Sequence, residues 1–180
     1  MVASAAELLR QNGVAGTGFR DVVEHSGTPR GSIAHHFPGG KRQLVAEAVR
    51  LSGATAAAMM RRAEEEGPSV ALARICDSFR TALIASDYAA GCPVGAVAQE
   101  EWREPELRDA ASEVFDEWRA IMRSLMQDQG VEKERAEDLA DLTVSAFEGA
   151  LLMCRIDRST VPLDRVERLL GPMLDDASGR

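Results

Sequence analysis

The chain has 180 residues, of which 45% are hydrophobic, 28% are charged and 4% are aromatic. This length allows one or two domains with a buried core, and no apolar run reaches the roughly 18 residues of a membrane span. The formal net charge of −8 excludes a uniformly basic surface. However, residues 1–50 hold six Lys or Arg against four Asp or Glu, whereas residues 51–180 hold fifteen against twenty-five. A mildly basic head therefore precedes an acidic body, and local charge sets the field at a binding face.

The beginning of the chain, MVASAAELLRQNG, lacks the basic start and long apolar stretch of a secretory signal. The three cysteines, Cys76, Cys92 and Cys154, are far apart and odd in number. This spacing predicts buried, reduced thiols rather than a disulfide framework or a zinc site. We therefore expect a cytoplasmic protein with no membrane contact, no metal and no cofactor.

Apolar residues recur at helical spacing from the start of the chain, and no alternating strand pattern is found. Glycines or a proline–glycine turn end each of the first helices. A Thr-Pro pair at positions 28 and 29 is a helix start signal, since a capping hydroxyl precedes a proline in the first helical position. Three short helices are expected first, at residues 3–11, 19–26 and 29–36.

Residues 28–44, TPRGSIAHHFPGGKRQL, combine side chains that could serve a metal site, a phosphate loop or a nucleic-acid reader. His35 and His36 are adjacent, so on a helix they point about 100° apart and cannot easily bind one ion from one face. The PGGK segment lacks the spacing of a phosphate loop and follows no strand. Contact with DNA by at least one histidine is the favoured interpretation, and plain surface or packing roles are the alternative.

The second and third short helices have helix-turn-helix proportions, with a tight glycine turn between them. In such a unit the second helix enters the major groove, where Gly31 lets the backbone come close and Arg30 can bind a phosphate or a guanine edge. Lys41 begins the next helix, so its ammonium and the helix N-terminus can both meet a phosphate. The candidate DNA-binding residues are Thr17, Thr28, Arg30, Gly31, Ser32, His35, His36 and Lys41.

The rest of the chain is also helical by its apolar periodicity. Gly-Pro-Ser, Gly-Cys-Pro, Glu-Pro and Gly130 mark the breaks, and the hydroxyls of Thr17 and Ser69 can cap the helices that follow them. The pattern predicts an all-α fold without a sheet. After the three short helices, we expect helices at residues 41–66, 69–87, 93–103, 105–129, 132–158 and 162–174.

The stretch GFRDVVEHSGTPRGSIAHHFPGGKRQLVAEAV resembles the DNA-binding segment of the TetR family of bacterial transcriptional regulators. The similar features are the glycine turn, the following R-G-S-I-x-H-H-F, and then G-K-x-x-L. The form P-R-G-S…H-H-F-P-G-G-K is particularly similar to the LmrA-like branch, whose members respond to drugs or flavonoids. The segment GCPVGAVAQE at 91–100 resembles a motif in the ligand domain of that branch.

Two departures from the family pattern bear on DNA affinity. Ala34 occupies a position where family members usually have a tyrosine that touches a DNA phosphate. The first helix also begins almost at Met1, whereas family members usually carry several more, often basic, residues before it. Both departures predict weaker DNA binding and leave the expected fold unchanged.

The resemblance implies a helix-turn-helix DNA-binding domain at 1–46 and a ligand-binding and dimerisation domain at 47–180. It implies a cavity between the middle helices, and a homodimer formed by the last two helices; the plainer alternative is that these side chains only fill the monomer core. The expected cavity residues are Met59, Phe79, Leu83, Cys92, Val97, Gln99, Trp102, Trp118, Met122, Phe147 and Leu151. The expected dimer residues are Leu142, Ala146, Gly149, Ala150, Met153, Val166, Leu169, Leu170 and Met173.

The resulting hypothesis is a homodimeric DNA-binding regulator, a repressor released from a palindromic double-stranded DNA operator by a small lipophilic or aromatic effector. Two reading helices about one DNA turn apart suit such an operator. The chain is not expected to be an enzyme, since no nucleophile, base and acid come together in the sequence. The alternatives are a helical protein-interaction adaptor, and a small-molecule-binding protein that has lost DNA binding.

Overall fold

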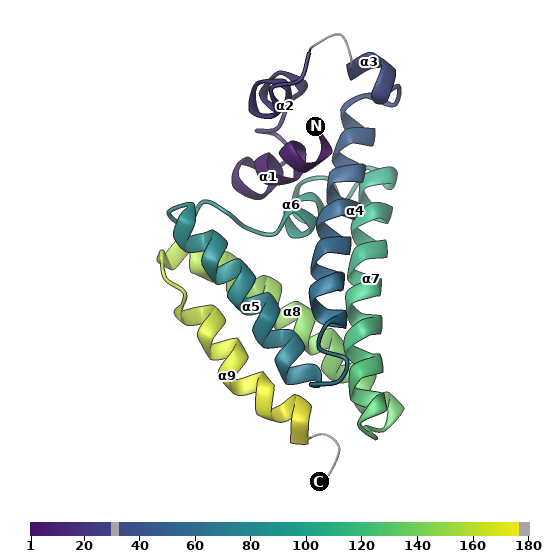
Figure 1. Cartoon of the computed structure of the whole chain (residues 1–180), viewed down its shortest axis with the longest axis vertical. Helices are drawn as coiled ribbons and strands as arrows, with labels where there is room; N and C mark the ends of the chain where they lie inside the picture. Colours follow the sequence, from purple (N-terminus) through teal and green to yellow (C-terminus); the bar gives the residue numbers. More distant parts are fainter. Residues whose placement is uncertain (30–32, 177–180) are drawn as a thin grey trace. The chain divides into compact units, whose positions relative to one another are not determined.

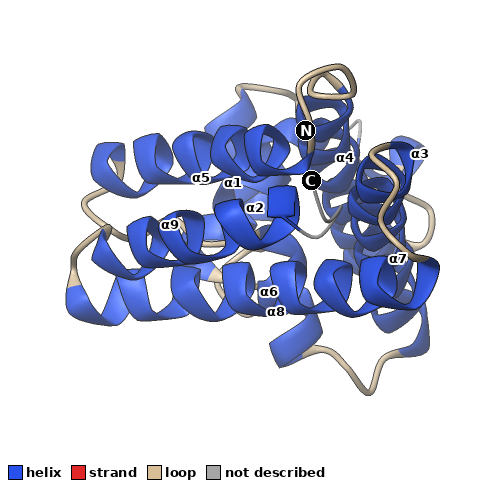
Figure 2. Ribbon diagram, turned by 90° about the horizontal axis from the view of Figure 1, so that it is seen from below, coloured by secondary structure: helices blue, strands red, loops and turns tan. Residues whose placement is uncertain are grey.

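The computed structural model describes residues 1–29 and 33–176. In these ranges the chain consists of helices joined by turns, without a strand, so the predicted all-α fold is confirmed (Figure 2). The helices follow the glycine and proline breaks of the sequence (Figure 1). They are α1 Val2–Asn12, α2 Phe19–Ser26, α3 Ile33–His36, α4 Gly40–Arg61, α5 Pro68–Ala85, α6 Pro93–Glu100, α7 Pro105–Asp128, α8 Lys133–Asp157 and α9 Val161–Asp176.

The prediction that the third helix begins at Pro29 is wrong. Thr28 and Pro29 are not helical, and the described part of α3 begins at Ile33. The Thr28 hydroxyl shares a 2.6 Å hydrogen bond with the Ser26 hydroxyl. A local side-chain bond of this kind competes with helix capping.

Other boundaries differ by a few residues. Ser69 does not cap α5 as predicted, because the N-cap is Gly67 with φ 107° and Pro68 opens the helix. Proline suits this first position because its missing N–H has no partner there anyway. The preceding helix, α4, ends at Arg61 in place of 66, and α6 ends at Glu100 in place of 103.

The described chain folds as two compact units. The first unit comprises residues 1–54 and 89–114, and the second comprises residues 55–88 and 115–180. α4 and α7 each begin in the first unit and end in the second. The predicted domain boundary at 46/47 is a functional division taken from the family, and it remains a proposal.

In the first unit, α1 packs against α2 and α6 (Figure 1). Small and branched apolar side chains from these helices and from the start of α4 form its core. Burying them removes apolar surface from water, the main favourable term in folding. The side chains include Ala5, Leu9, Val22, Phe37, Leu44, Val49, Val94 and Val97.

In the second unit, α5, α8 and α9 lie side by side (Figure 1). Their facing sides are apolar, with a buried stripe on each helix at helical spacing. On α8, Leu142 is 45% exposed and Ala146 is half-buried, so neither belongs fully to the buried stripe. The core includes Leu72, Phe79, Leu83, Leu139, Phe147, Leu151, Leu163 and Leu174.

One charged cluster fastens α9 to α5. Arg80 of α5 donates from Nε to Asp164 at 2.9 Å and from Nη2 to Glu167 at 2.7 Å, and it also pairs with Asp77. Burial by itself lowers the pKa of the Arg80 guanidinium, but the hydrogen bonds to Glu167 and Asp164 outweigh it, so the pKa is raised. The cluster holds α9 in one register against α5.

No helix within the described ranges is both long and apolar enough to cross a membrane.

Candidate nucleic-acid interface and ligand cavity

Local interactions define both ends of α2 and the side of the helix that faces outward. Gly27 adopts the left-handed region at φ 65°, which favours glycine. At the other end of α2, the Asp21 carboxylate accepts a 2.9 Å hydrogen bond from the Gly18 N–H. Val22 and Val23 are buried, so the polar side of this helix faces outward.

His35 and His36 at the end of α3 are both exposed, as the helix-turn-helix hypothesis expects for side chains that read DNA. Phe37 is 5% exposed, and its ring lies 6.4 Å from that of Phe19. Gln43 of α4 accepts from the Gly39 N–H at 2.9 Å and donates to the His36 carbonyl at 3.3 Å. Gln43, which no sequence pattern singled out, thus fixes the turn between the two helices.

The other candidate DNA contacts differ in their surroundings. Thr17 is only 2% exposed, and its hydroxyl donates to the Gly13 carbonyl at 2.8 Å, so the predicted contact of Thr17 with DNA does not fit the structure. Thr28 is half-buried. Lys41 Nζ donates to the Val14 carbonyl at 2.7 Å, which leaves two ammonium hydrogens for a phosphate. Arg30, Gly31 and Ser32 lie outside the described residues.

The loop between α1 and α2 is held by a carboxylate from a distant helix. The backbone N–H groups of Val14 and Ala15 both donate to Glu100 Oε2 of α6, at 2.9 and 3.1 Å. No sequence pattern indicates this carboxylate, because the two segments lie about 85 residues apart in the chain.

The rings of the two neighbouring histidines lie close together and are steeply inclined to each other. Their ring centroids are 5.3 Å apart and the planes cross at 71°. Within the described residues, no three His, Cys, Asp or Glu side chains are placed to hold a metal ion together.

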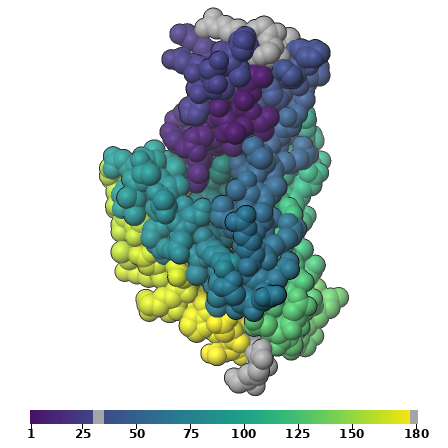
Figure 3. Space-filling view, viewed as in Figure 1, coloured from purple at the N-terminus to yellow at the C-terminus, as the bar shows by residue number. Residues whose placement is uncertain are grey.

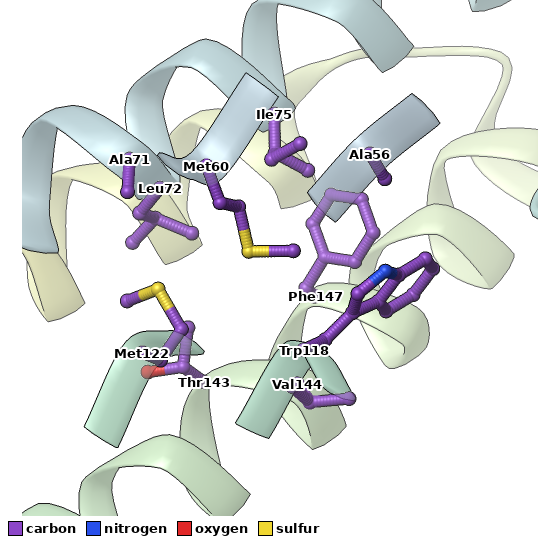
Figure 4. A pocket seen from close by; sticks show the side chains of 10 residues that line it. All are labelled: Ala56, Met60, Ala71, Leu72, Ile75, Trp118, Met122, Thr143, Val144 and Phe147. Atoms are coloured by element: carbon purple, nitrogen blue, oxygen red, sulfur yellow. The ribbon is translucent and has the colours of Figure 1, made fainter. Parts of the chain in front are cut away.

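A small apolar cavity, with about 30 Å³ of free volume, lies inside the second unit (Figure 4). Side chains from α4, α5, α7 and α8 enclose it. The Thr143 hydroxyl in its wall already donates to the Leu139 carbonyl at 2.7 Å. The wall is uncharged, and the Trp118 indole N–H is its other polar side-chain group. The lining residues are Ala56, Met60, Ala71, Leu72, Ile75, Trp118, Met122, Thr143, Val144 and Phe147.

The cavity includes three of the side chains expected to line it: Trp118, Met122 and Phe147. Of the neighbouring Met pair, Met60 lines the cavity and Met59 does not. Phe79 contacts the ring of Phe147 edge-on at 5.1 Å, and Leu83 and Leu151 belong to the buried core. The candidates in α6 and next to it do not line the cavity either, because they belong to the first unit. Cys92 and Val97 are buried there, Gln99 is exposed and Trp102 is 53% exposed.

An apolar strip runs along the outer side of α8 and α9. Of the expected dimer residues, Leu142, Met153, Leu169 and Met173 are 40–57% exposed, and Gly149 has open space around it. Ala150 and Leu170 are 6% and 7% exposed, so they contribute mainly to the core of the chain itself. Three exposed side chains on these helices were not predicted: Leu152, Ile156 and Val161.

A helix-turn-helix segment followed by a helical unit with an internal cavity defines a DNA-binding regulator. A family model described as bacterial regulatory proteins of the tetR family matches residues 2–48. A second, the C-terminal domain of LmrA/YxaF-like transcriptional regulators, matches residues 68–169. The chain belongs to the TetR family of transcriptional regulators, within the LmrA/YxaF-like group, as the resemblance in its sequence predicted.

Individual relatives agree over nearly the whole chain. A helix-turn-helix-type transcriptional regulator of Mycobacterium tuberculosis is 41% identical, over 97% of this chain and 92% of the relative. The regulator LmrA of Bacillus subtilis is 26% identical over 97% and 94%. The crystal structure of a TetR regulator from Legionella pneumophila matches with a TM-score of 0.85 at 20% identity, covering 96% and 94%, which supports the fold.

Proposed function

We propose that this regulator is a homodimeric repressor that leaves a palindromic operator when an uncharged lipophilic or aromatic effector occupies the cavity of the second unit. The observation that carries the proposal is the apolar cavity itself. Its free volume of about 30 Å³ is well below the roughly 300–1,000 Å³ of small-molecule sites, so an effector has to displace side chains of the wall. A DNA-binding segment joined to a cavity that opens in this way suits a protein whose DNA affinity depends on a small molecule.

The lining of the cavity restricts the chemistry of the effector. Burying a charge without a partner is costly, and the wall offers no charged side chain to pair with one. Trp118 and Phe147 present aromatic surfaces, and the flexible thioethers of Met60 and Met122 can rearrange around an aromatic guest. A hydrophobic aromatic compound is therefore favoured over a charged metabolite.

The apolar strip on α8 and α9 supports a homodimer. An exposed strip of Leu, Ile and Met side chains on neighbouring helices is typical of a surface that another protein covers. Within the chain, α9 packs against α5. Their surfaces, yellow and teal, lie side by side in Figure 3, and the Arg80 cluster joins the two helices. In a two-fold dimer the same strip would meet its own copy, as in most homodimers.

Regulation requires that the effector prefer one of two shapes. α4 carries Lys41 at its beginning and the cavity residues Ala56 and Met60 further along. An effector that displaces Met60 would bias the position of α4 and, through it, the spacing of the two DNA-binding segments. The coupling free energy cannot exceed the differential affinity of the effector for the two shapes, typically about 1–3 kcal/mol.

The effector site is tested by filling the cavity. Ala71→Leu places a larger side chain in the wall, whereas Ala85→Leu adds the same bulk at an exposed position of the same helix. A library of aromatic compounds is screened for quenching of tryptophan fluorescence and for release of DNA that the protein selects from a random double-stranded pool. We expect Ala71→Leu to keep DNA binding and lose release, and Ala85→Leu to keep both. Equal release by both variants would contradict the site.

The dimer is tested with a side chain that the monomer does not bury. Ile156 is 73% exposed on α8, and Ile84 is 60% exposed on α5, a helix that contributes none of the strip residues. Ile156→Glu is expected to give a folded monomer in sedimentation and to weaken operator binding, because the two half-sites are then read separately. Ile84→Glu is expected to remain dimeric. A dimeric Ile156→Glu protein would argue that another face forms the interface.

A further inference from the structure

The loop of residues 13–18, between α1 and α2, is held by hydrogen bonds to side chains of two other helices. Its Val14 and Ala15 N–H groups donate to one oxygen of Glu100 in α6, and its Val14 carbonyl accepts from Lys41 in α4. Hydrogen bonds to an ionised acceptor are shorter and stronger than neutral ones. The loop is thus fixed on both its donor and its acceptor side.

Gly13 makes room for the Glu100 carboxylate. A Cβ atom at this position would lie 2.1 Å from Glu100 Oε1, far inside any van der Waals contact. The backbone of Gly13 also has φ 69°, a conformation that side-chain-bearing residues rarely adopt. A side chain at position 13 would therefore have to displace the Glu100 carboxylate from the loop, and the positive φ favours glycine as well.

The segment that contains α6 is also hydrogen-bonded to α1, at the end opposite Glu100. The Gly91 N–H, just before α6, donates to the Arg10 carbonyl near the end of α1 at 2.6 Å. Glu100 is the last residue of α6. The helix therefore reaches from the end of α1 to the following loop, and both contacts lie within the first unit.

The loop leads directly into the helix-turn-helix. Gly18 is the N-cap of α2, and Thr17 just before it is buried and bonded to Gly13. A shift at Val14 or Ala15 would thus reach Gly18, the N-cap of α2, within three or four positions. We propose that Glu100 is a positioning residue for DNA binding: its carboxylate holds the loop of residues 13–18 and thereby fixes the start of the helix-turn-helix. This inference rests on the proposed DNA binding.

A simpler interpretation of Glu100 predicts the opposite change in DNA affinity when its charge is removed. Glu100 is exposed and negative, so as a plain surface charge it would repel the phosphates of DNA. Removing that charge would then strengthen DNA binding. The positioning role predicts weaker binding after the same change, because the Val14 and Ala15 N–H groups lose their acceptor.

Four variants separate these interpretations. Glu100→Ala removes the acceptor, and Glu100→Gln keeps one carbonyl oxygen that can accept the same two bonds without the charge. Glu101→Ala and Glu101→Gln are matched controls, since none of the described hydrogen bonds ends on the Glu101 side chain. Each variant is titrated with DNA that the wild-type protein selects from a random double-stranded pool. Hydrogen exchange of the Val14 and Ala15 amides reports on the loop directly.

We expect Glu100→Ala to bind the selected DNA about tenfold more weakly than wild type, Glu100→Gln to lie between the two, and both Glu101 variants to bind as wild type or more tightly. The two amides should exchange faster in Glu100→Ala and not in Glu101→Ala. DNA binding by Glu100→Ala equal to that of Glu101→Ala would overturn the inference, as would unchanged amide exchange. A wild-type protein that selects no DNA would overturn the proposed function itself, and this inference with it.

Discussion

Different kinds of interaction stabilise each of the two compact units. In the first unit, side chains from distant parts of the sequence bind the main chain of one loop, as Glu100 and Lys41 do at Val14. In the second unit, apolar packing encloses a cavity, and a single charged cluster around Arg80 fastens α9 to α5. A polar substitution should therefore affect the first unit most, and a change of volume the second.

This difference matches the tasks proposed for the two units. Reading DNA requires side chains held at a defined position, which directional hydrogen bonds provide. Accepting a lipophilic guest requires an apolar wall that can rearrange, which Met60 and Met122 provide.

The largest expected effect comes from the side chains proposed to read DNA in the first unit. Arg30→Ala combined with His35→Ala should weaken binding to the selected DNA by about 100-fold, since each base or phosphate contact contributes roughly 1–3 kcal/mol. Thermal unfolding should change little, because His35 is exposed. Fluorescence anisotropy measures the affinity, and Arg62→Ala, an exposed arginine of the second unit, is the control.

The next effect concerns the charged cluster around Arg80 in the second unit. Arg80→Ala leaves Asp164 and Glu167 without their shared partner, so the free energy of unfolding should fall by about 1–2 kcal/mol. Arg74→Ala removes a pair with Glu66 that is more exposed on both sides, and should cost less than about 0.5 kcal/mol. Urea unfolding of both variants checks this, and equal losses would mean that the Arg80 cluster is an ordinary surface pair.

A smaller effect separates the two possible roles of Lys41. If the ammonium contacts a phosphate as well as the Val14 carbonyl, Lys41→Gln should lower the slope of log affinity against log salt by about 0.9 for each protomer. We expect this reduction together with weaker binding. Weaker binding at an unchanged slope would assign Lys41 to the loop alone. Lys133→Gln, a 74% exposed lysine of the second unit, should change neither quantity.

The smallest effect is a lack of reactivity in the second unit. Burial raises the pKa of the Cys76 thiol to about 12, and the nearby Glu167 carboxylate adds to the rise. At pH 8 the folded protein should therefore leave Cys76 unlabelled by iodoacetamide, while denatured protein is labelled. Because the folded pKa is raised, this thiol contributes stability below pH 9.0, its ordinary pKa, that is lost as the pH rises towards 12. Rapid labelling at pH 8 would show that the second unit opens around Cys76.

The helices themselves were predictable from the sequence, whereas their ends were less so. Apolar spacing and glycine or proline breaks located every helix of the described chain to within a few residues. The start of α3 and the caps of α2 and α5 were wrong, because capping depends on which side chain reaches the free backbone groups. Thr17 illustrates this, since its hydroxyl binds the Gly13 carbonyl and Gly18 is the N-cap of α2.

The candidate cavity residues were also predicted correctly in one part and wrongly in another. Trp118, Met122 and Phe147 could be expected in the cavity because they lie on the inner faces of long amphipathic helices. The α6 candidates were expected there from the resemblance, but α6 packs with α1 in the first unit. Periodicity shows which face of a helix is apolar and does not show which partner covers it.

Residue spacing along the chain was enough to predict the all-α class, the helix-turn-helix segment and the family. The packing of the helices, in contrast, brings Glu100 and Lys41 to the loop before α2, buries Thr17 and places Met60 rather than Met59 in the cavity wall. Local patterns do not reveal such contacts. Contacts between segments dozens of residues apart form only when the helices pack, and adjacent residues on a helix point in different directions.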